Sequence, residues 1–229
     1  MKTIISGKKE ACQKAADEIA RLVRDKPDAC IAFSAAEIPD ELFEELRVLY
    51  LAGKADFSKL RVFTAAEYVP GNMLGALLRE KMHSRVNISR ENCFFMNEDT
   101  YSKYDKTIAS FGGLDMAVLG LGDNCQIGFN EAGTPFSSLT HIQKLTDSFR
   151  RQFASLFGDQ EKIPEKGMTL GIRSITNADK IIVLAFGEGK ADALHRMYYA
   201  RNDIATPAAF LQIPSDVSVY TDPAAAINL

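Results

Sequence analysis

The sequence predicts a single α/β domain, built on a mainly parallel β-sheet with helices flanking both of its faces. Two observations lead to this prediction. Short apolar runs alternate with amphipathic segments along all 229 residues, which is typical of a parallel sheet covered on both sides. No internal repeat, low-complexity tract or Pro/Gly-rich linker divides the chain, so one domain over residues 1–229 is the simplest organisation.

The first elements can be justified in order along the chain. Thr3–Ile5 is a short apolar run that reads as a first β-strand, not as the long apolar stretch of a signal peptide. Glu10–Asp25 is expected to be a helix, because its apolar residues recur at helical spacing and share one face. Cys30–Phe33 has the composition of a buried strand. Ser34 and Glu37 then have the spacing of a capping box before the next helix.

The remaining elements follow the same alternation. Apolar runs with β-branched and aromatic residues predict further strands at Arg61–Thr64, Cys93–Met96, Met116–Leu119, Met168–Ile172, Ile181–Phe186 and Val217–Tyr220. Amphipathic segments predict further helices at Pro39–Leu51, Met73–His83, Tyr101–Phe111, Asp147–Phe157 and Lys190–Tyr199. Ligands of such sheets bind at the carboxyl ends of strands. The expected site therefore lies among the loops Ser34–Pro39, Ala65–Gly71, Gly120–Thr134 and Gly187–Lys190.

Composition excludes several classes of protein. Apolar residues make up 46% of the chain, which is enough for a sizeable core, and no run approaches membrane-spanning length. The net charge of −3 and the scattered Lys and Arg residues argue against a nucleic-acid surface. The four cysteines show neither CxxC nor Cys/His ligand spacing, so no metal site is expected. They are expected to be free thiols in a reducing compartment. The default expectation is a cytoplasmic protein.

The most informative segment runs from Met116 to Thr134. It reads as a buried strand, a glycine turn and a polar loop that ends in the carboxylate of Glu131. Its part Gly120-Leu-Gly-Asp-Asn-Cys-Gln-Ile-Gly-Phe-Asn-Glu131 resembles the signature loop of the glucosamine-6-phosphate deaminases, a group related to the 6-phosphogluconolactonases. Further similar blocks occur in the same order, at Phe63–Tyr68, Thr140–Ile142, Thr169–Gly171, Gly187–Lys190 and Pro207–Gln212. The resemblance covers nearly the whole chain and implies a deaminase-like, Rossmann-type fold.

The resemblance also implies positions for the acid/base groups, and several of them are substituted here. Family members carry a histidine where this chain has Gln126, an aspartate where it has Asn124, and a catalytic aspartate where it has Ala66. Glu131 matches a fourth acid/base position of the family, and it is the one of the four that keeps an ionisable side chain. Amides form hydrogen bonds but do not transfer protons at ordinary pH, whereas ring opening and proton abstraction need groups that do.

Two neighbouring carboxylates are candidate substitutes. Glu67 follows Ala66, and Asp123 precedes Asn124. In an extended segment adjacent side chains point to opposite faces, so each would need a bulge to reach the position of the lost group.

The phosphate-binding turn implied by the resemblance is altered as well. It corresponds to Ser34, Ala35, Ala36 and Glu37, where the glycines and the threonine of the family are absent. A dianionic phosphate would meet the like charge of Glu37 there, so Glu37 alternatively binds an amine or hydroxyl of an unphosphorylated ligand. Lys190 matches the family lysine that helps to bind the phosphate, and it is equally compatible with a solvated helix start.

Three functions remain open. By resemblance the chain is a glucosamine-6-phosphate deaminase/isomerase-like protein of carbohydrate metabolism, acting without a cofactor on an amino-sugar phosphate. The first alternative is a catalytically degenerate paralogue, or pseudoenzyme, which binds a sugar or sugar phosphate or acts as a scaffold. The second is a related isomerase or hydrolase with a changed sugar-phosphate substrate. Deaminase activity on glucosamine 6-phosphate is expected to be very weak or absent. The expected partner is a small sugar ligand, and a homo-oligomer stays open.

Overall fold

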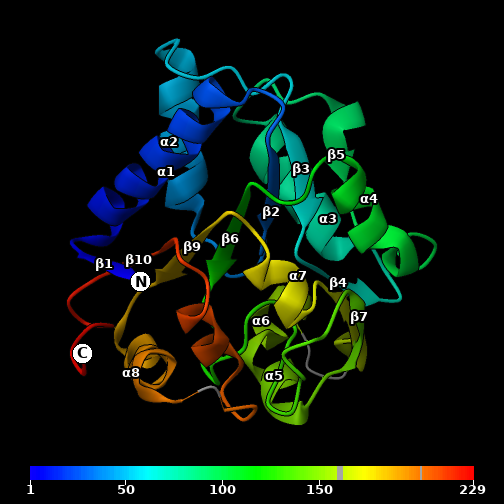
Figure 1. The fold of residues 1–229 in the computed structure, drawn as a ribbon, viewed down its shortest axis with the longest axis vertical. Coiled ribbons are helices and arrows are strands. Elements are labelled where there is room, and N and C mark those ends of the chain that lie inside the picture. The colour runs from blue at the N-terminus through cyan, green and yellow to red at the C-terminus, as the bar shows by residue number, and fades with distance from the viewer. Residues whose placement is uncertain (159–161, 202) are drawn as a thin grey trace.

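The computed structural model describes residues 1–158, 162–201 and 203–229 and is organised around a seven-stranded sheet (Figure 1). The strand order is β1-β10-β9-β6-β2-β3-β5, and every neighbouring pair is parallel. The strands are β1 (Lys2–Ile5), β2 (Cys30–Phe33), β3 (Arg61–Thr64), β5 (Cys93–Phe94), β6 (Met116–Gly120), β9 (Lys180–Ala185) and β10 (Val217–Thr221). The predicted fold class, a mainly parallel sheet flanked by helices, is confirmed.

Helices cover both faces of this sheet because its central strands are apolar on both sides. Ile31 and Phe33 of β2 belong to one buried cluster, together with the packed faces of α1 (Lys8–Asp25), α2 (Asp40–Leu51) and α3 (Met73–His83). Cys30 and Ala32 of the same strand point the other way, into a second cluster. Residues of α4 (Tyr104–Ser110), α7 (Ile172–Thr176) and α8 (Ala191–Tyr199) complete that second cluster. The period-two alternation of a strand thus divides the core into two layers.

A small second sheet was not predicted. It is antiparallel, in the order β4-β8-β7, and consists of β4 (Ala66–Val69), β8 (Lys166–Thr169) and β7 (His141–Lys144). The predicted strand Met168–Ile172 is therefore wrong at its end, since Ile172 already begins α7. The strand ends before Gly171, where the chain packs closely against the loop that contains Ser138. A Cβ added at Gly171 would lie only 2.1 Å from the Ser138 carbonyl oxygen.

Most helices agree with prediction, and the differences are local. The predicted helix Asp147–Phe157 is divided at Phe153 into α5 (Asp147–Gln152) and α6 (Ala154–Phe157). The segment before α4 is a 3-10 turn, η2 (Tyr101–Lys103), and the segment before α8 is another, η4 (Glu188–Lys190). The described part of the chain has no helix that combines the length and the apolar character needed to cross a membrane.

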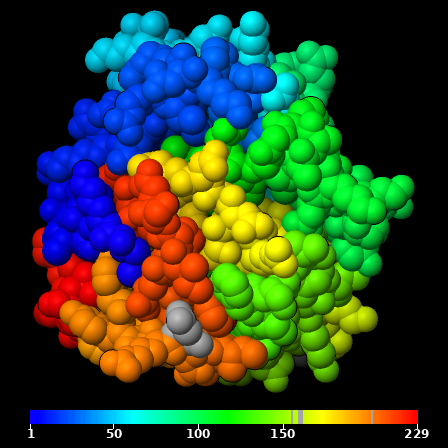
Figure 2. All heavy atoms as spheres, in the orientation of Figure 1, coloured from blue at the N-terminus to red at the C-terminus, as the bar shows by residue number. Residues whose placement is uncertain are grey.

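Segments distant in sequence meet on the surface. In the space-filling view the yellow segment that contains α7 lies between the green and the orange-red parts of the chain (Figure 2). The orange-red neighbour includes the 3-10 helix η5 (Pro207–Gln212), which contacts both α7 and α8. At the edge of the main sheet, β1 pairs with β10, so the two ends of the chain are held together.

Candidate active site at the carboxyl edge of the sheet

The four loops singled out from the sequence follow β2, β3, β6 and β9, which are neighbours in the sheet. Because these strands are parallel, all four loops leave the same edge of the sheet. The chain runs outward from β2 to β3 and β5 in one direction and to β6, β9 and β10 in the other. The reversal therefore falls between β2 and β6, the position at which α/β sheets commonly bind ligands.

The loops after β2 and β6 touch at that position. Gly120, the last residue of β6, lies so close to Glu37 that an added Cβ would be 2.1 Å from the Cβ of Glu37. Glycine is therefore required at position 120, because any side chain would collide with the Ser34–Pro39 loop. This close approach places Glu37 directly over the end of the central strand.

Four side chains gather there and are called the carboxyl-edge cluster: Ser34, Glu37, Asp123 and Lys190. The hydroxyl of Ser34 donates a hydrogen bond to Oε2 of Glu37, and Lys190 forms an ion pair with Asp123. Burial raises the pKa of Glu37 to about 7, although the Ser34 hydrogen bond and the charge of Lys190 act to lower it. The cluster therefore contains a carboxyl group that titrates near neutral pH.

The expected capping box at Ser34 and Glu37 is wrong. The two side chains bond to each other, and α2 begins only at Asp40, with Pro39 in the N-cap position. Residues 34–37 form a turn, closed by a hydrogen bond from the Glu37 N–H to the Ser34 carbonyl oxygen. The cause is Pro39, whose ring disfavours helical backbone at Ile38 and delays the helix.

Lys81 of α3 fixes this turn and was missed from the sequence. Its ammonium group donates to the carbonyl oxygens of Ala35 and Ile38, each at 3.2 Å, and pairs with Asp40 at 3.0 Å. Ala35 is buried and Ala36 is half-buried. Nothing in the spacing of Lys81 marks it, because its partners lie on another element.

The two amides of the signature loop have defined partners on α5. Nε2 of Gln126 donates to Gln152 at 2.6 Å, and its Oε1 accepts from the Asn124 N–H at 2.9 Å. Nδ2 of Asn124 donates to the hydroxyl of Ser148 at 2.8 Å. Gln126 is buried, and Gly122 makes room for it. The amides therefore hold the loop to α5 with groups that do not titrate.

Glu131 also supports α5. One of its carboxylate oxygens accepts from the Thr146 N–H at 3.0 Å, and the other accepts from the Thr146 hydroxyl. Thr146 is in turn the N-cap of α5 and accepts from the Phe149 N–H. The third carboxylate position of the family is thus tied to the start of a helix.

Ala66 and Glu67 lie on β4, and their side chains point to opposite faces as expected for a strand. Glu67 is fully buried, and its carboxylate accepts from the N–H groups of Tyr68, Leu74 and Gly75 at 2.7–3.0 Å. Two of these donors belong to the first turn of α3, so the contacts of Glu67 are those of a helix cap. The buried methyl group of Ala66 offers no proton-transferring group.

Cys125 is the one described residue other than glycine with a positive φ, 60°. This left-handed backbone conformation is one that glycine adopts without strain, so Cys125 occupies a position that favours glycine. The thiol is buried and donates to the carbonyl oxygen of Ala193, and burial raises its pKa to about 11. A thiol that is protonated at neutral pH is a poor nucleophile.

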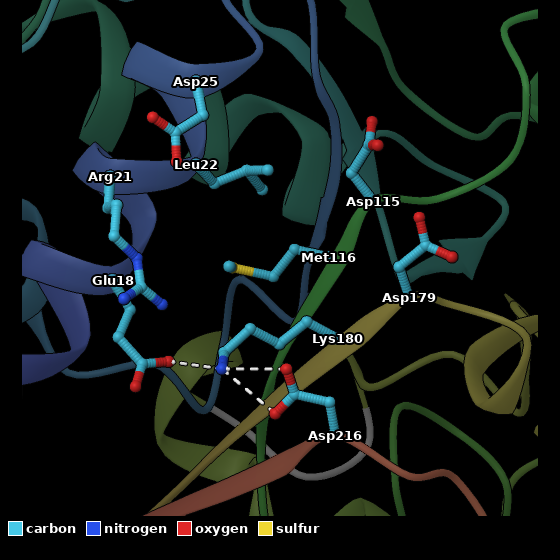
Figure 3. A pocket seen from close by; sticks show the side chains of 9 residues that line it. All are labelled: Glu18, Arg21, Leu22, Asp25, Asp115, Met116, Asp179, Lys180 and Asp216. Atoms are coloured by element: carbon cyan, nitrogen blue, oxygen red, sulfur yellow. Dashed lines mark hydrogen bonds and ion pairs between the residues drawn. The ribbon is translucent and has the colours of Figure 1, made fainter.

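A cavity lies at the opposite, amino-terminal edge of the sheet (Figure 3). It is lined by Glu18, Arg21, Leu22, Asp25, Asp115, Met116, Asp179, Lys180 and Asp216. Lys180 lies between Glu18 and Asp216, at 3.0 and 3.1 Å from their oxygens, as the dashed lines in Figure 3 show. These ion pairs join α1 to the starts of β9 and β10, which is a structural role. Within the described residues, no group of three or more His, Cys, Asp or Glu side chains is arranged to hold a metal ion.

The fold and the carboxyl-edge loops define an α/β protein of the sugar-phosphate isomerase and lactonase class. The family model of "Glucosamine-6-phosphate isomerases/6-phosphogluconolactonase" matches residues 6–220. The chain belongs to this family, as the resemblance implied.

Individual relatives agree with this assignment. A protein of Clostridioides difficile (strain 630), named glucosamine-6-phosphate deaminase, is 33% identical over 228 residues, covering 95% of this chain and 92% of the relative. One of Bacillus pumilus with the same name is 30% identical and covers 94% of each chain. The solved structure of a monomeric glucosamine-6-phosphate deaminase superimposes with a TM-score of 0.96 at 27% identity, over the full length of both chains. A 6-phosphogluconolactonase from Trypanosoma brucei shares the fold, with a TM-score of 0.76 at 17% identity over 100% of this chain and 98% of that one.

Proposed function

We propose that this protein is a sugar-binding member of the family whose deaminase activity on glucosamine 6-phosphate is very weak or absent. The observation that carries the proposal is the state of Gln126. At the position where the resemblance puts a histidine, a buried amide is held between the Asn124 N–H and Gln152. Such a group orients and packs, but it does not exchange protons near neutral pH.

The neighbouring carboxylates support the same proposal. Glu67 accepts three backbone N–H bonds, and both oxygens of Glu131 accept from Thr146. Neither is placed in the carboxyl-edge cluster by its contacts. General acid/base groups each contribute about 10²–10⁴-fold to a rate, and groups that act as a unit fail together. We therefore assign the site to ligand binding.

A coupled ammonia-release assay with glucosamine 6-phosphate tests the first half of the proposal. The purified Clostridioides difficile relative is the positive control. Turnover by this protein is expected to fall far below about one per second, and turnover at or above that rate would overturn the proposal. A thermal-shift titration with sugars and sugar phosphates tests the second half, since a ligand of the folded state raises the unfolding temperature with its concentration.

A second candidate function rests on Asp123. Its carboxylate is exposed at the carboxyl edge and pairs with Lys190, so of the two proposed substitutes it is the one that belongs to the carboxyl-edge cluster. An enzyme with a changed sugar-phosphate substrate would use Asp123 with Glu131. In that case the wild-type protein would isomerise a sugar phosphate and Asp123→Asn would not. Asp147 is an exposed acid on α5, and Asp147→Asn would keep the activity.

A further inference from the structure

The carboxyl group of Glu37 lacks a hydrogen bond at one of its two oxygens. Oε2 accepts from Ser34, whereas Oε1 is buried and has no hydrogen-bond partner among the residues that the structure describes. Ser34 is itself buried, and the backbone of Gly120 closes the other side. A buried carboxylate oxygen without a donor is costly, because it has lost its water and gained nothing in exchange. A donor supplied by a bound ligand would satisfy this oxygen.

The charges around Glu37 indicate the sign of that donor. The charged neighbours that influence its carboxyl group are Lys190, which is attractive, and Asp123, which is repulsive. Lys190 is already paired with Asp123. Ionised Glu37 thus leaves the carboxyl-edge cluster with one negative charge in excess. A cationic donor would neutralise this charge, whereas a phosphate would add to it.

We propose that Glu37 is the specificity-determining residue for a protonated primary amine, carried by a sugar that has no phosphate group. The proposal rests on the proposed sugar-binding function and names the ligand class for the same site. In this arrangement the ligand ammonium donates to Oε1 of Glu37 while Ser34 keeps Oε2. The Lys190–Asp123 pair remains beside it and carries no net charge.

The geometry of the turn at residues 34–37 favours binding of a ligand by Glu37 over a role of Glu37 in capping the next helix. Glu37 belongs to no helix, and the helix that follows already has Asp40 and Glu41 in its first turn. Lys81 holds the carbonyl oxygens on both sides of Glu37, at Ala35 and Ile38. The carboxylate is thereby kept in one place before a ligand arrives, which lowers the entropic cost of binding.

Calorimetric titration near neutral pH with glucosamine, glucose and glucosamine 6-phosphate tests the proposal. Wild-type protein is expected to bind glucosamine about tenfold or more tightly than glucose, the gain typical of a charge-assisted hydrogen bond. Glucosamine 6-phosphate is expected to bind more weakly than glucosamine. In Glu37→Gln the preference for glucosamine over glucose should disappear, while the affinity for glucose changes little.

Glu41→Gln is the matched control. It removes an acid of the same kind on α2 that pairs with Lys8 instead of facing Gly120, so it should keep the preference. Equal affinities for glucosamine and glucose in the wild type would overturn the proposal and leave sugar binding standing. Tighter binding of glucosamine 6-phosphate would also overturn it, and absence of binding by all three sugars would overturn the proposed function as well. The wild-type comparison decides the matter even if Glu37→Gln does not fold.

Discussion

Replacing Glu37 with Gln is expected to stabilise the protein above neutral pH and to leave its stability nearly unchanged in mild acid. Burial raises the pKa of Glu37 from 4.5 to about 7 in the folded state. Between these two values the folded protein keeps a proton that the unfolded chain has released, so the free energy of unfolding falls as pH rises through this window. Above it, the whole cost of the buried charge is present.

The size of the effect follows from the same shift. The two pKa values differ by about 2.5, and at about 1.4 kcal/mol for each factor of ten this gives an upper limit of about 3–4 kcal/mol. For a chain of this length that is at most roughly 7–14 °C in unfolding temperature. Gln is nearly isosteric with Glu and can still accept from Ser34, so the substitution removes the charge with little change of packing.

Thermal unfolding of the wild type and of Glu37→Gln, followed by circular dichroism from about pH 5 to about pH 8.5, measures this difference. The two unfolding temperatures should be close at the acid end and separate progressively as pH rises, with the variant higher. Glu41→Gln should show no such gain, since Lys8 lowers the pKa of that half-buried carboxyl group. Curves for Glu37→Gln and the wild type that run parallel over the whole range would refute the reasoning.

Three other substitutions test the supports of the site. Glu67→Gln should cost about 2–3 kcal/mol in urea unfolding, because one buried N–H of the α3 start loses a charged acceptor, and an unchanged midpoint would contradict the capping role. Gly122→Ala should cost about 1–3 kcal/mol, because the new Cβ would lie 1.9 Å from Cδ of Gln126; full stability would show that the loop adapts. Lys81→Met should speed amide hydrogen exchange in residues 34–38, and exchange equal to the wild type would exclude Lys81 as their support.

The main sheet was predictable because its strands are buried on both faces and therefore stand out as continuous apolar runs. Cys30–Phe33 is buried at every residue, and its predicted bounds match β2. β7 was missed for the opposite reason. His141–Lys144 is polar and alternates between half-buried and exposed residues, so its strand character comes from pairing with β8 and not from its composition.

The meeting of the four candidate loops at one edge of the sheet was predictable, whereas the contacts of their side chains were less so. Strand geometry alone predicted that Ala66 and Glu67 face opposite ways, but the target of Glu67 depends on where the chain turns back to form α3. Lys81 gave no signal at all, since Ala35 and Ile38 lie 46 and 43 residues away in sequence. Contacts between separate elements follow from the tertiary fold and leave no short-range pattern.

The bonds from Glu131 to Thr146 have a consequence for how proteins of this kind are classified. A residue that anchors a helix start stabilises the fold, whether or not any reaction depends on it. The run Phe129-Asn130-Glu131 is consequently a marker of shared architecture. Under the proposed function, a chain that carries this run keeps the helix anchor, whereas its catalytic competence depends on other residues, such as those at positions 66, 124 and 126.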